Sequence, residues 1–196
     1  MAIQSHITRD DRIVGRRGLG LIQLFEGHGK GKTTAALGEA LRAVGAGFKV
    51  AIVFFDKGGP HYAERDAIAA HLYGAIDIVG TGRDRIDPVT GRFDFSVTDE
   101  DKQEAERGLA AARTFFHNEE HQLVILDEIN STVALGMLNE ERVLELLNQK
   151  PDEVECILTG RNAPESFKER AHLVTCMELK KHYFYSGVPA REGIDL

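Results

Sequence analysis

Short apolar runs alternate along the chain with longer segments in which apolar residues recur at helical spacing. Strands are predicted at residues 20–25, 49–55, 76–79, 122–127, 153–158 and 173–177. Helices are predicted at residues 33–44, 62–72, 98–116 and 139–149. The apolar runs have no polar face, which is typical of strands that helices cover on both sides. The pattern therefore predicts an α/β fold with a mostly parallel sheet and helices on both faces.

The periodic pattern begins near residue 20. The residues before it mix acidic and basic side chains and show no apolar period. We therefore expect an N-terminal arm at residues 1–19 that lies outside the core. The remaining residues, 20–196, are expected to form one domain, because a chain of 196 residues has the usual length of a single domain.

Charge and cysteine content narrow the classes of protein. The chain has 24 Lys and Arg against 31 Asp and Glu, a net charge of −7, which argues against general binding to nucleic acid or anionic membranes. Its apolar runs are much shorter than the roughly 20 residues of a membrane-spanning helix. Cys156 and Cys176 form no CxxC pattern, as is typical of a reducing compartment. We expect a cytoplasmic protein that binds neither nucleic acid nor membrane.

A segment rich in glycine and lysine joins the first predicted strand to the first predicted helix. Its sequence, EGHGKGKTT at residues 26–34, ends in the Gly-Lys-Thr of a P-loop, although Glu26 stands where the common pattern has glycine. Flexible backbone and a helix N-terminus both direct N–H groups at phosphate. We expect Lys32 to reach the terminal phosphates and the Thr33 hydroxyl to bind Mg²⁺. The predicted phosphate-binding residues are Gly27, His28, Gly29, Lys30, Gly31, Lys32, Thr33 and Thr34.

Two carboxylates follow a later apolar run, LVILDE at residues 123–128. The carboxyl ends of parallel strands meet at the edge where α/β proteins bind ligands, and a P-loop protein needs a carboxylate there for its magnesium. The candidate metal ligands are Thr33, Asp127 and Glu128, and the sequence leaves open which carboxylate binds directly. These residues predict a RecA-like P-loop fold that binds ATP or GTP with Mg²⁺. They do not define the reaction.

Further segments, in order from residue 20 to the C-terminus, resemble one enzyme family. The doubled Gly-Lys-Gly-Lys-Thr-Thr loop at residues 29–34 is followed by Arg-Ala-Val-Gly-Ala-Gly at residues 42–47. Later segments are LDEIN at 126–130, LTGR at 158–161, KH at 181–182, Gly187, AR at 190–191 and GID at 193–195. Together they resemble the ATP:corrinoid adenosyltransferases of the CobA/CobO/BtuR type.

The resemblance implies transfer of the 5′-deoxyadenosyl group of ATP to the Co(I) of a corrinoid, with release of triphosphate, in adenosylcobalamin biosynthesis or salvage. The nucleophile is then the substrate's cobalt, and the expected catalytic residues are Lys32, Thr33 and Glu128. The backbone amides of residues 27–31, with Lys30, Lys32 and Mg²⁺, are expected to stabilise the departing triphosphate. The resemblance also implies a homodimer and an external reductase such as a flavoprotein. Arg161, Lys181 and His182 are candidate contacts to nucleotide or corrinoid, with surface charge or an ion pair as the alternative.

The family's Phe-x-Trp pair, which closes the lower face of cobalt, has no full match, because the chain contains no Trp. Its nearest equivalent is Phe93-Asp94-Phe95. Phe93 and Phe95 either shield cobalt or pack at alternate positions of a strand. Two other functions remain open from the sequence: a P-loop ATPase or kinase that releases ADP, and a non-catalytic corrinoid carrier gated by ATP.

Overall fold

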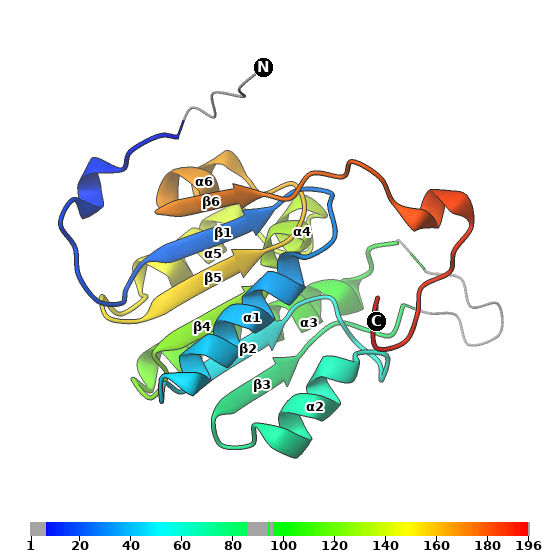
Figure 1. Cartoon of the computed structure of the whole chain (residues 1–196), viewed down its shortest axis with the longest axis horizontal. Helices are drawn as coiled ribbons and strands as arrows, with labels where there is room; N and C mark the ends of the chain where they lie inside the picture. The colour runs from blue at the N-terminus through cyan, green and yellow to red at the C-terminus, as the bar shows by residue number, and fades with distance from the viewer. Residues whose placement is uncertain (1–6, 86–93, 95, 196) are drawn as a thin grey trace.

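A parallel β-sheet forms the centre of the protein (Figure 1). The computed structural model describes residues 7–85, 94 and 96–195. Across the sheet the order is β3-β2-β4-β5-β1-β6, and every neighbouring pair is parallel. All six predicted strands are present, each with ends within two residues of those expected. The strands are β1 (Ile22–Glu26), β2 (Val50–Phe54), β3 (Ile76–Gly80), β4 (Leu123–Asp127), β5 (Glu155–Thr159) and β6 (Leu173–Cys176).

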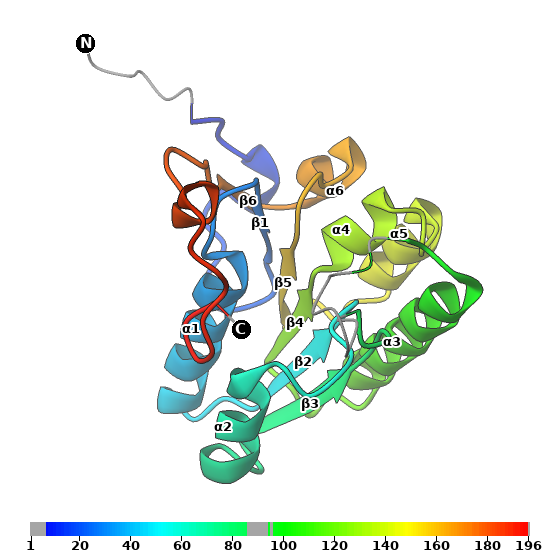
Figure 2. The same cartoon turned by 90° about the vertical axis from the view of Figure 1, so that its right-hand side faces the viewer.

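Helices cover both faces of this sheet (Figure 2). Helices α1 and α2 lie on one face and α3 to α6 on the other, so the predicted α/β architecture is confirmed. Helices α4 and α6 were not predicted, because each is shorter than two turns and gives too little periodicity. The bounds are α1 (Lys32–Gly45), α2 (Ala63–His71), α3 (Asp99–His117), α4 (Ile129–Ala134), α5 (Glu140–Asn148) and α6 (Glu165–Arg170).

Strand β2 illustrates why the apolar runs lack a polar face. Val50, Ile52 and Phe54 belong to the apolar cluster under α1 and α2. Ala51 and Val53 belong to the opposite cluster, under α3 and α5. All five side chains are fully buried, and this removal of apolar surface from water, about 25 cal/mol per Å², is the main stabilising contribution of the strand.

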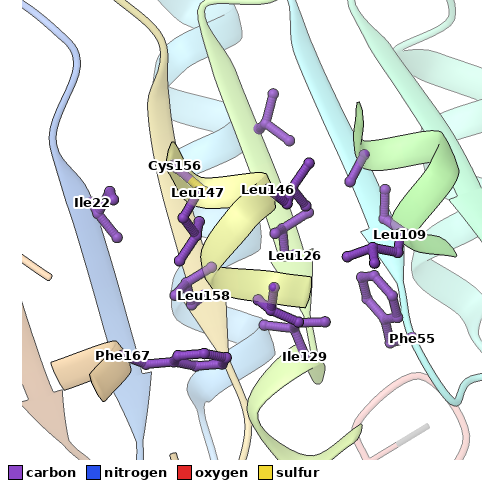
Figure 3. Packing of buried hydrophobic residues seen from close by; sticks show 14 of the residues in the cluster. Ile22, Phe55, Leu109, Leu126, Ile129, Leu146, Leu147, Cys156, Leu158 and Phe167 are labelled. Carbon is purple, nitrogen blue, oxygen red and sulfur yellow. The ribbon is translucent and has the colours of Figure 1, made fainter. Parts of the chain in front are cut away.

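The larger apolar cluster, between the sheet and α3 to α6, is closely packed (Figure 3). Leu147 of α5 lies beside Leu158 of β5, and Leu146 lies beside Leu126 of β4. At the far side of this cluster, a Cβ on Gly108 would lie only 2.6 Å from Cε1 of Phe55. Helix α3 therefore needs glycine at position 108 to approach the residue that follows β2.

The predicted start of α3 is confirmed by its hydrogen bonds. The Thr98 hydroxyl accepts from the Asp101 N–H, and the Asp101 carboxylate accepts from the Thr98 N–H at 2.7 Å. This capping box satisfies two N–H groups that the first turn would otherwise leave unpaired.

Among the described residues, no helix is both long and apolar enough to cross a membrane.

The described part of the predicted arm, residues 7–19, contains no buried side chain. A short 3₁₀-helix, Asp11–Ile13, lies within it. The Arg12 guanidinium donates to the carbonyl of Ala171 at 3.1 Å, and that of Arg16 donates to the carbonyl of Asp152 at 2.6 Å. These residues therefore lie along the surface of the domain and add nothing to its core.

Candidate active site

The glycine-rich loop connects β1 to α1 at the carboxyl edge of the sheet. Gly27 and Gly31 have φ angles of 100° and 119°, in the left-handed region that favours glycine. A Cβ on Gly27 would lie 2.5 Å from the carbonyl oxygen of Met177, and the Gly29 N–H donates to that oxygen at 2.7 Å. The loop therefore packs against the chain that follows β6. Gly31 caps α1, so the N-terminus of this helix opens onto the loop.

A cavity of about 710 Å³ lies at this edge. One wall is the loop and the residues after β4 and β5, and the other includes part of residues 177–195, called here the C-terminal segment. Three predicted site residues, Gly27, Asp127 and Lys181, do not line the cavity. The predicted residues Phe93 and Phe95 lie outside the described residues. The predicted residues that line the cavity are His28, Gly29, Lys30, Gly31, Lys32, Thr33, Thr34, Glu128, Arg161 and His182.

Asp127, the last residue of β4, lies behind the cavity wall and is 1% exposed. Its Oδ1 accepts from the Thr159 hydroxyl at 2.7 Å, and its Oδ2 lies 3.3 Å from Thr33 Oγ1. The Lys57 ammonium donates to the same Oδ2 and, at 3.0 Å, to Thr33 Oγ1. Helix α1, strand β5 and the segment after β2 thus converge on one buried carboxylate.

Lys57 and Thr159 were not predicted from the sequence as site residues. Strands β2 and β5 flank β4, and Phe54 is in register with Asp127, so polar residues at the ends of these strands reach its carboxylate. The signals in the sequence are a polar residue at the end of each of two apolar runs and, for Thr159, its place in the LTGR segment. These signals become specific only when the strand order is known, and the apolar pattern does not supply that order.

Glu128 turns the chain from β4 into α4 with a φ of 63°. Non-glycine residues in this left-handed conformation are uncommon and cluster at functional sites. Its N–H donates to the Thr159 hydroxyl at 2.9 Å, and its carboxylate accepts from the Ser131 hydroxyl at 2.6 Å. Ser131 Oγ in turn accepts from the Arg161 N–H at 2.8 Å. Thr159 of β5 therefore holds the Glu128 backbone, and Ser131 of α4, itself held by the Arg161 N–H, holds the Glu128 carboxylate at the cavity wall.

Two lysines give this wall positive charge. Burial lowers the pKa of Lys32, whose ammonium donates to the Gly29 carbonyl at 3.0 Å. Burial also acts to lower the pKa of Lys57, but the neighbouring Asp127 and Glu128 outweigh it, and the pKa of Lys57 is raised. Cations beside a helix N-terminus form a surface suited to a polyphosphate.

The C-terminal segment is held to the loop through Lys30. The Lys30 ammonium forms an ion pair with Asp195 and lies 3.2 Å from the Tyr183 hydroxyl. Arg191 lies over the Tyr183 ring, 4.6 Å from its centroid, and pairs with Asp195 at 2.9 Å. Lys30, then Tyr183 and Arg191, hold the pKa of the Asp195 carboxyl well below its ordinary value. Lys30 thus links the loop to this segment, and Tyr183 was not singled out from the sequence.

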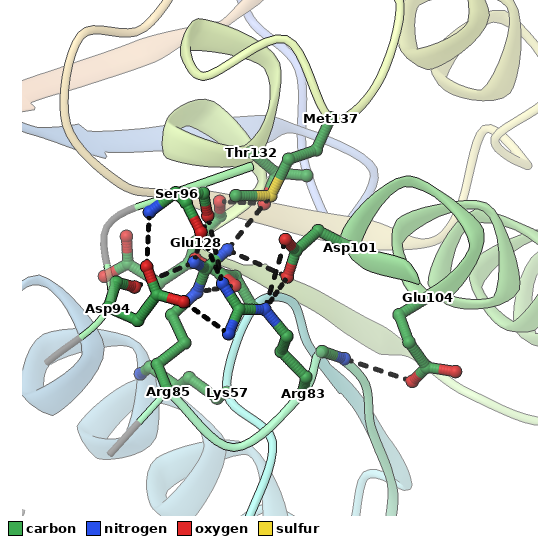
Figure 4. A network of polar contacts seen from close by, with 12 residues as sticks. Lys57, Arg83, Arg85, Asp94, Ser96, Asp101, Glu104, Glu128, Thr132 and Met137 are labelled. Atoms are coloured by element: carbon green, nitrogen blue, oxygen red, sulfur yellow. Dashed lines mark hydrogen bonds and ion pairs between the residues drawn. The ribbon is translucent and has the colours of Figure 1, made fainter. Parts of the chain in front are cut away.

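A second polar network centres on Arg83 and Arg85, with Lys57 and Glu128 nearby (Figure 4). Arg85, 5% exposed, donates to Asp56 at 2.6 Å and to Asp101 at 3.0 Å. Arg83 pairs with Asp101 at 3.0 Å and with Asp94 at 2.8 Å. Asp94 stands between the two phenylalanines proposed from the family resemblance, so this network anchors the described residue of that segment.

The fold and the site define a class of protein. A glycine-lysine loop after β1, a carboxylate at the end of β4, and β5 between these strands are the arrangement of RecA-like P-loop proteins. The solved structure of the flagellar accessory protein FlaH from Methanocaldococcus jannaschii superimposes with a TM-score of 0.56, covering 87% of this chain and 77% of that one at 16% identity. At that identity the similarity shows the fold alone, and the predicted fold class is confirmed.

Sequence comparison gives the family. The model of a family described as ATP:corrinoid adenosyltransferase BtuR/CobO/CobP matches residues 18–196. A corrinoid adenosyltransferase of Escherichia coli K12 is 38% identical over 176 residues, covering 90% of this chain and 85% of the relative. One from Sinorhizobium sp is 35% identical over 179 residues, covering 90% and 80%. Uncharacterized protein all2391 of Nostoc sp. PCC 7120 is 36% identical over 182 residues, covering 89% of this chain, which spans 47% of that protein.

The chain therefore belongs to the ATP:corrinoid adenosyltransferase family, and the resemblance inferred from its motifs is confirmed. Membership makes it an enzyme of the transferase class, with ATP and a corrinoid as the substrates that the family implies. The family match spans the loop, Asp127, Glu128 and the C-terminal segment, so the whole wall of the cavity lies within the region that the relatives share.

Proposed function

We propose that the protein transfers the 5′-deoxyadenosyl group of ATP to the Co(I) of a reduced corrinoid. The cobalt lone pair attacks C5′, the C5′–O bond breaks, and its electron pair leaves with the triphosphate, so that cobalt ends as alkylated Co(III). Family membership supports the choice of substrates. Lys32 and Thr33 line one wall of the cavity, and Asp127 contacts Thr33 from behind that wall; this is the observation that supports the assignment of residues.

The residues of this wall act on the leaving group. Loop N–H groups and the N-terminus of α1 face the position proposed for triphosphate, and Lys32 is assigned to its terminal phosphate. Negative charge accumulates on the leaving oxygen as the C5′–O bond breaks, so these groups stabilise the transition state more than bound ATP. We place C5′ toward the open part of the cavity, where cobalt can approach it.

The oxygen donors of the site fit Mg²⁺. Thr33 Oγ1 and Asp127 Oδ2 lie 3.3 Å apart, close to the spacing of about 3 Å between neighbouring ligands in an octahedron with bonds of about 2.1 Å. Glu128 is the third candidate. Among the residues that the structure describes, no group of three or more His, Cys, Asp or Glu side chains could hold a metal, so phosphate and water would complete the shell. Bound Mg²⁺ supplies neutralisation of triphosphate charge.

Further residues at the cavity are assigned to substrate binding. Arg161 and His182 line the cavity and are assigned as contacts to nucleotide or corrinoid, with Lys181 as an exposed neighbour. Shielding of cobalt by Phe93 and Phe95 remains a prediction. A homodimer, a separate reductase that supplies Co(I), and a cytoplasmic location complete the proposal. Light scattering of the purified protein tests the dimer.

The reaction is tested with chemically reduced Co(I) corrinoid, ATP and Mg²⁺. We expect the absorbance spectrum of the adenosylated corrinoid to appear together with an equal amount of tripolyphosphate, measured by ion chromatography. Lys32→Ala should slow the formation of both products by about 10²- to 10³-fold, and Lys102→Ala, a change on the exposed surface of α3, should slow neither. ADP and phosphate as products would support the ATPase or kinase, and binding of both substrates without product would support the carrier.

A further inference from the structure

Lys57 is a buried cation that the proposed reaction does not yet use. Its side chain is 13% exposed, and its ammonium lies 5.7 Å from the ring centroids of both Phe54 and Tyr62. The ammonium donates to Asp127 Oδ2 and Thr33 Oγ1. Those two oxygens are the ones assigned above to Mg²⁺, so the ammonium lies between the candidate metal ligands.

This position has a physical explanation in the free protein. Asp127 is 1% exposed, and a buried carboxylate without a cation is strongly unfavourable. The Thr159 hydroxyl satisfies Oδ1 but carries no charge. Lys57 therefore supplies the neutralising charge and holds Asp127 and Thr33 at the separation that suits a divalent cation.

The same two oxygens cannot serve the ammonium and a metal together. An ammonium is a hydrogen-bond donor that has to face the lone pairs of its acceptors, and a Mg²⁺ ion needs those lone pairs for coordination. Any cation bound between Thr33 and Asp127 therefore requires the Lys57 side chain to move.

Hydrogen bonds fix the backbone of Lys57, while its side chain can rotate into the cavity. The Lys57 N–H donates to the Thr81 carbonyl at 2.8 Å, and its own carbonyl accepts from the Arg65 guanidinium. The residue also lines the cavity next to Lys32. Rotation about side-chain bonds alone can thus carry the ammonium from Asp127 toward a phosphate chain in the cavity.

We propose, on the basis of the function proposed above, that Lys57 is an exchangeable counter-ion and positioning residue. In the free protein its ammonium occupies the site between Thr33 and Asp127 where the divalent cation would bind. When a metal–nucleotide complex binds, it leaves that position and pairs with the phosphates. The free protein therefore excludes divalent cations, and metal enters together with nucleotide.

The test is a titration of the nucleotide-free protein with Mn²⁺, followed by electron paramagnetic resonance of the unbound ion. Wild type should bind Mn²⁺ weakly, and Lys57→Met should bind one Mn²⁺ about tenfold more tightly or better, because the competing charge has been removed. Adding Asp127→Asn to Lys57→Met should abolish this gain. Lys49→Met is the matched control, since Lys49 also pairs with two carboxylates, Asp77 and Glu120. It should leave Mn²⁺ affinity unchanged.

Equal Mn²⁺ affinity for wild type and folded Lys57→Met would overturn the proposal. If Lys57→Met does not fold, Lys57→Gln, which keeps a donor but not the charge, takes its place with the same expectations. The wild type gives an independent measurement: Mg²⁺ alone should not raise its melting temperature, whereas Mg²⁺ with tripolyphosphate should. A rise with Mg²⁺ alone, lost in Thr33→Val, would also overturn it.

These measurements use neither corrinoid nor turnover, so they separate the two proposals. If adenosylated corrinoid forms while the Mn²⁺ titrations of wild type and Lys57→Met coincide, only the assignment of Lys57 is wrong. If wild type binds neither Mn²⁺–ATP nor Mg²⁺–tripolyphosphate, the proposed function is wrong, and the role of Lys57 is wrong with it.

Discussion

On one side of the cavity, Lys32 and Asp127 belong to α1 and β4, and both are buried. On the other side, Tyr183 and Asp195 belong to the C-terminal segment, in which no residue from 177 to 195 is buried. The first wall is held by apolar packing on both faces of the sheet. The second is held mainly by polar contacts that centre on Lys30 and Asp195.

The packed wall and the polar wall suit two different tasks, stabilisation of the transition state and admission of a large substrate. Groups that stabilise a transition state have to be fixed in advance, and a packed sheet fixes them. A wall that admits a large substrate has to change shape at low cost, and exposed polar contacts cost little to break. We therefore expect substitutions at the packed wall to affect chemistry or stability, and substitutions in the C-terminal segment to affect binding and local order.

The largest expected effect compares two lysines of the same loop. Lys32→Ala should lower kcat/KM by about 10²- to 10³-fold, because it removes a fixed charge next to the leaving group. Lys30→Ala should act mainly on KM and only a few-fold, because Lys30 binds the C-terminal segment. Steady-state kinetics with Co(I) corrinoid measure both. Equal losses in kcat would contradict the division between the two walls.

An intermediate effect concerns the packing behind the first wall. Gly108→Ala should lower the free energy of unfolding, because the new methyl group would meet the Phe55 ring at a cost of about 1–3 kcal/mol, only partly offset by better helix propensity. Gly38→Ala is the matched change on α1, where nothing lies within 4 Å of the added Cβ, and it should raise stability by up to about 1 kcal/mol. Urea unfolding measures both, and the same sign for both variants would refute this account of α3.

The smallest effect belongs to the C-terminal segment. Asp195→Asn removes the charge that Lys30 and Arg191 bind, so limited proteolysis should cut residues 177–195 faster while the melting temperature stays nearly constant. The pKa of Asp195 is lowered from its ordinary 3.8. The contribution of the Asp195 charge to holding the C-terminal segment is therefore complete above pH 3.8 and is lost as pH falls through the lower folded-state pKa. Pepsin should cut wild type slowly at pH values just above 3.8 and faster only below it, and a transition at higher pH would contradict the assignment.

The sequence predicts the parts of the site that are local in the chain. The loop at residues 26–34 and Asp127 can be read directly, because strand, turn and helix follow one another there. The roles of Lys57 and Thr159 cannot be predicted in this way, because they depend on β2 and β5 lying on either side of β4. Apolar periodicity does not predict that strand order.

The C-terminal segment shows the same limit. Its motif at residues 181–195 supported the family resemblance, and the structure brings His182 to the cavity but leaves Lys181 exposed. The pairing of Lys30 with Asp195 joins residues at opposite ends of the chain, and no local pattern marks it. Phe93 and Phe95 were proposed by resemblance to the family alone.

The hydrogen bond from Gly29 to Met177 has a consequence for how many donors the loop can offer. An amide that is already paired with a carbonyl is not free for a phosphate oxygen, so the loop presents one N–H fewer while residue 177 stays in place. Recruiting that amide would require the chain beyond β6 to shift. The position of the chain beyond β6 and the number of loop N–H groups free to bind phosphate are therefore coupled, so a change in one requires a change in the other.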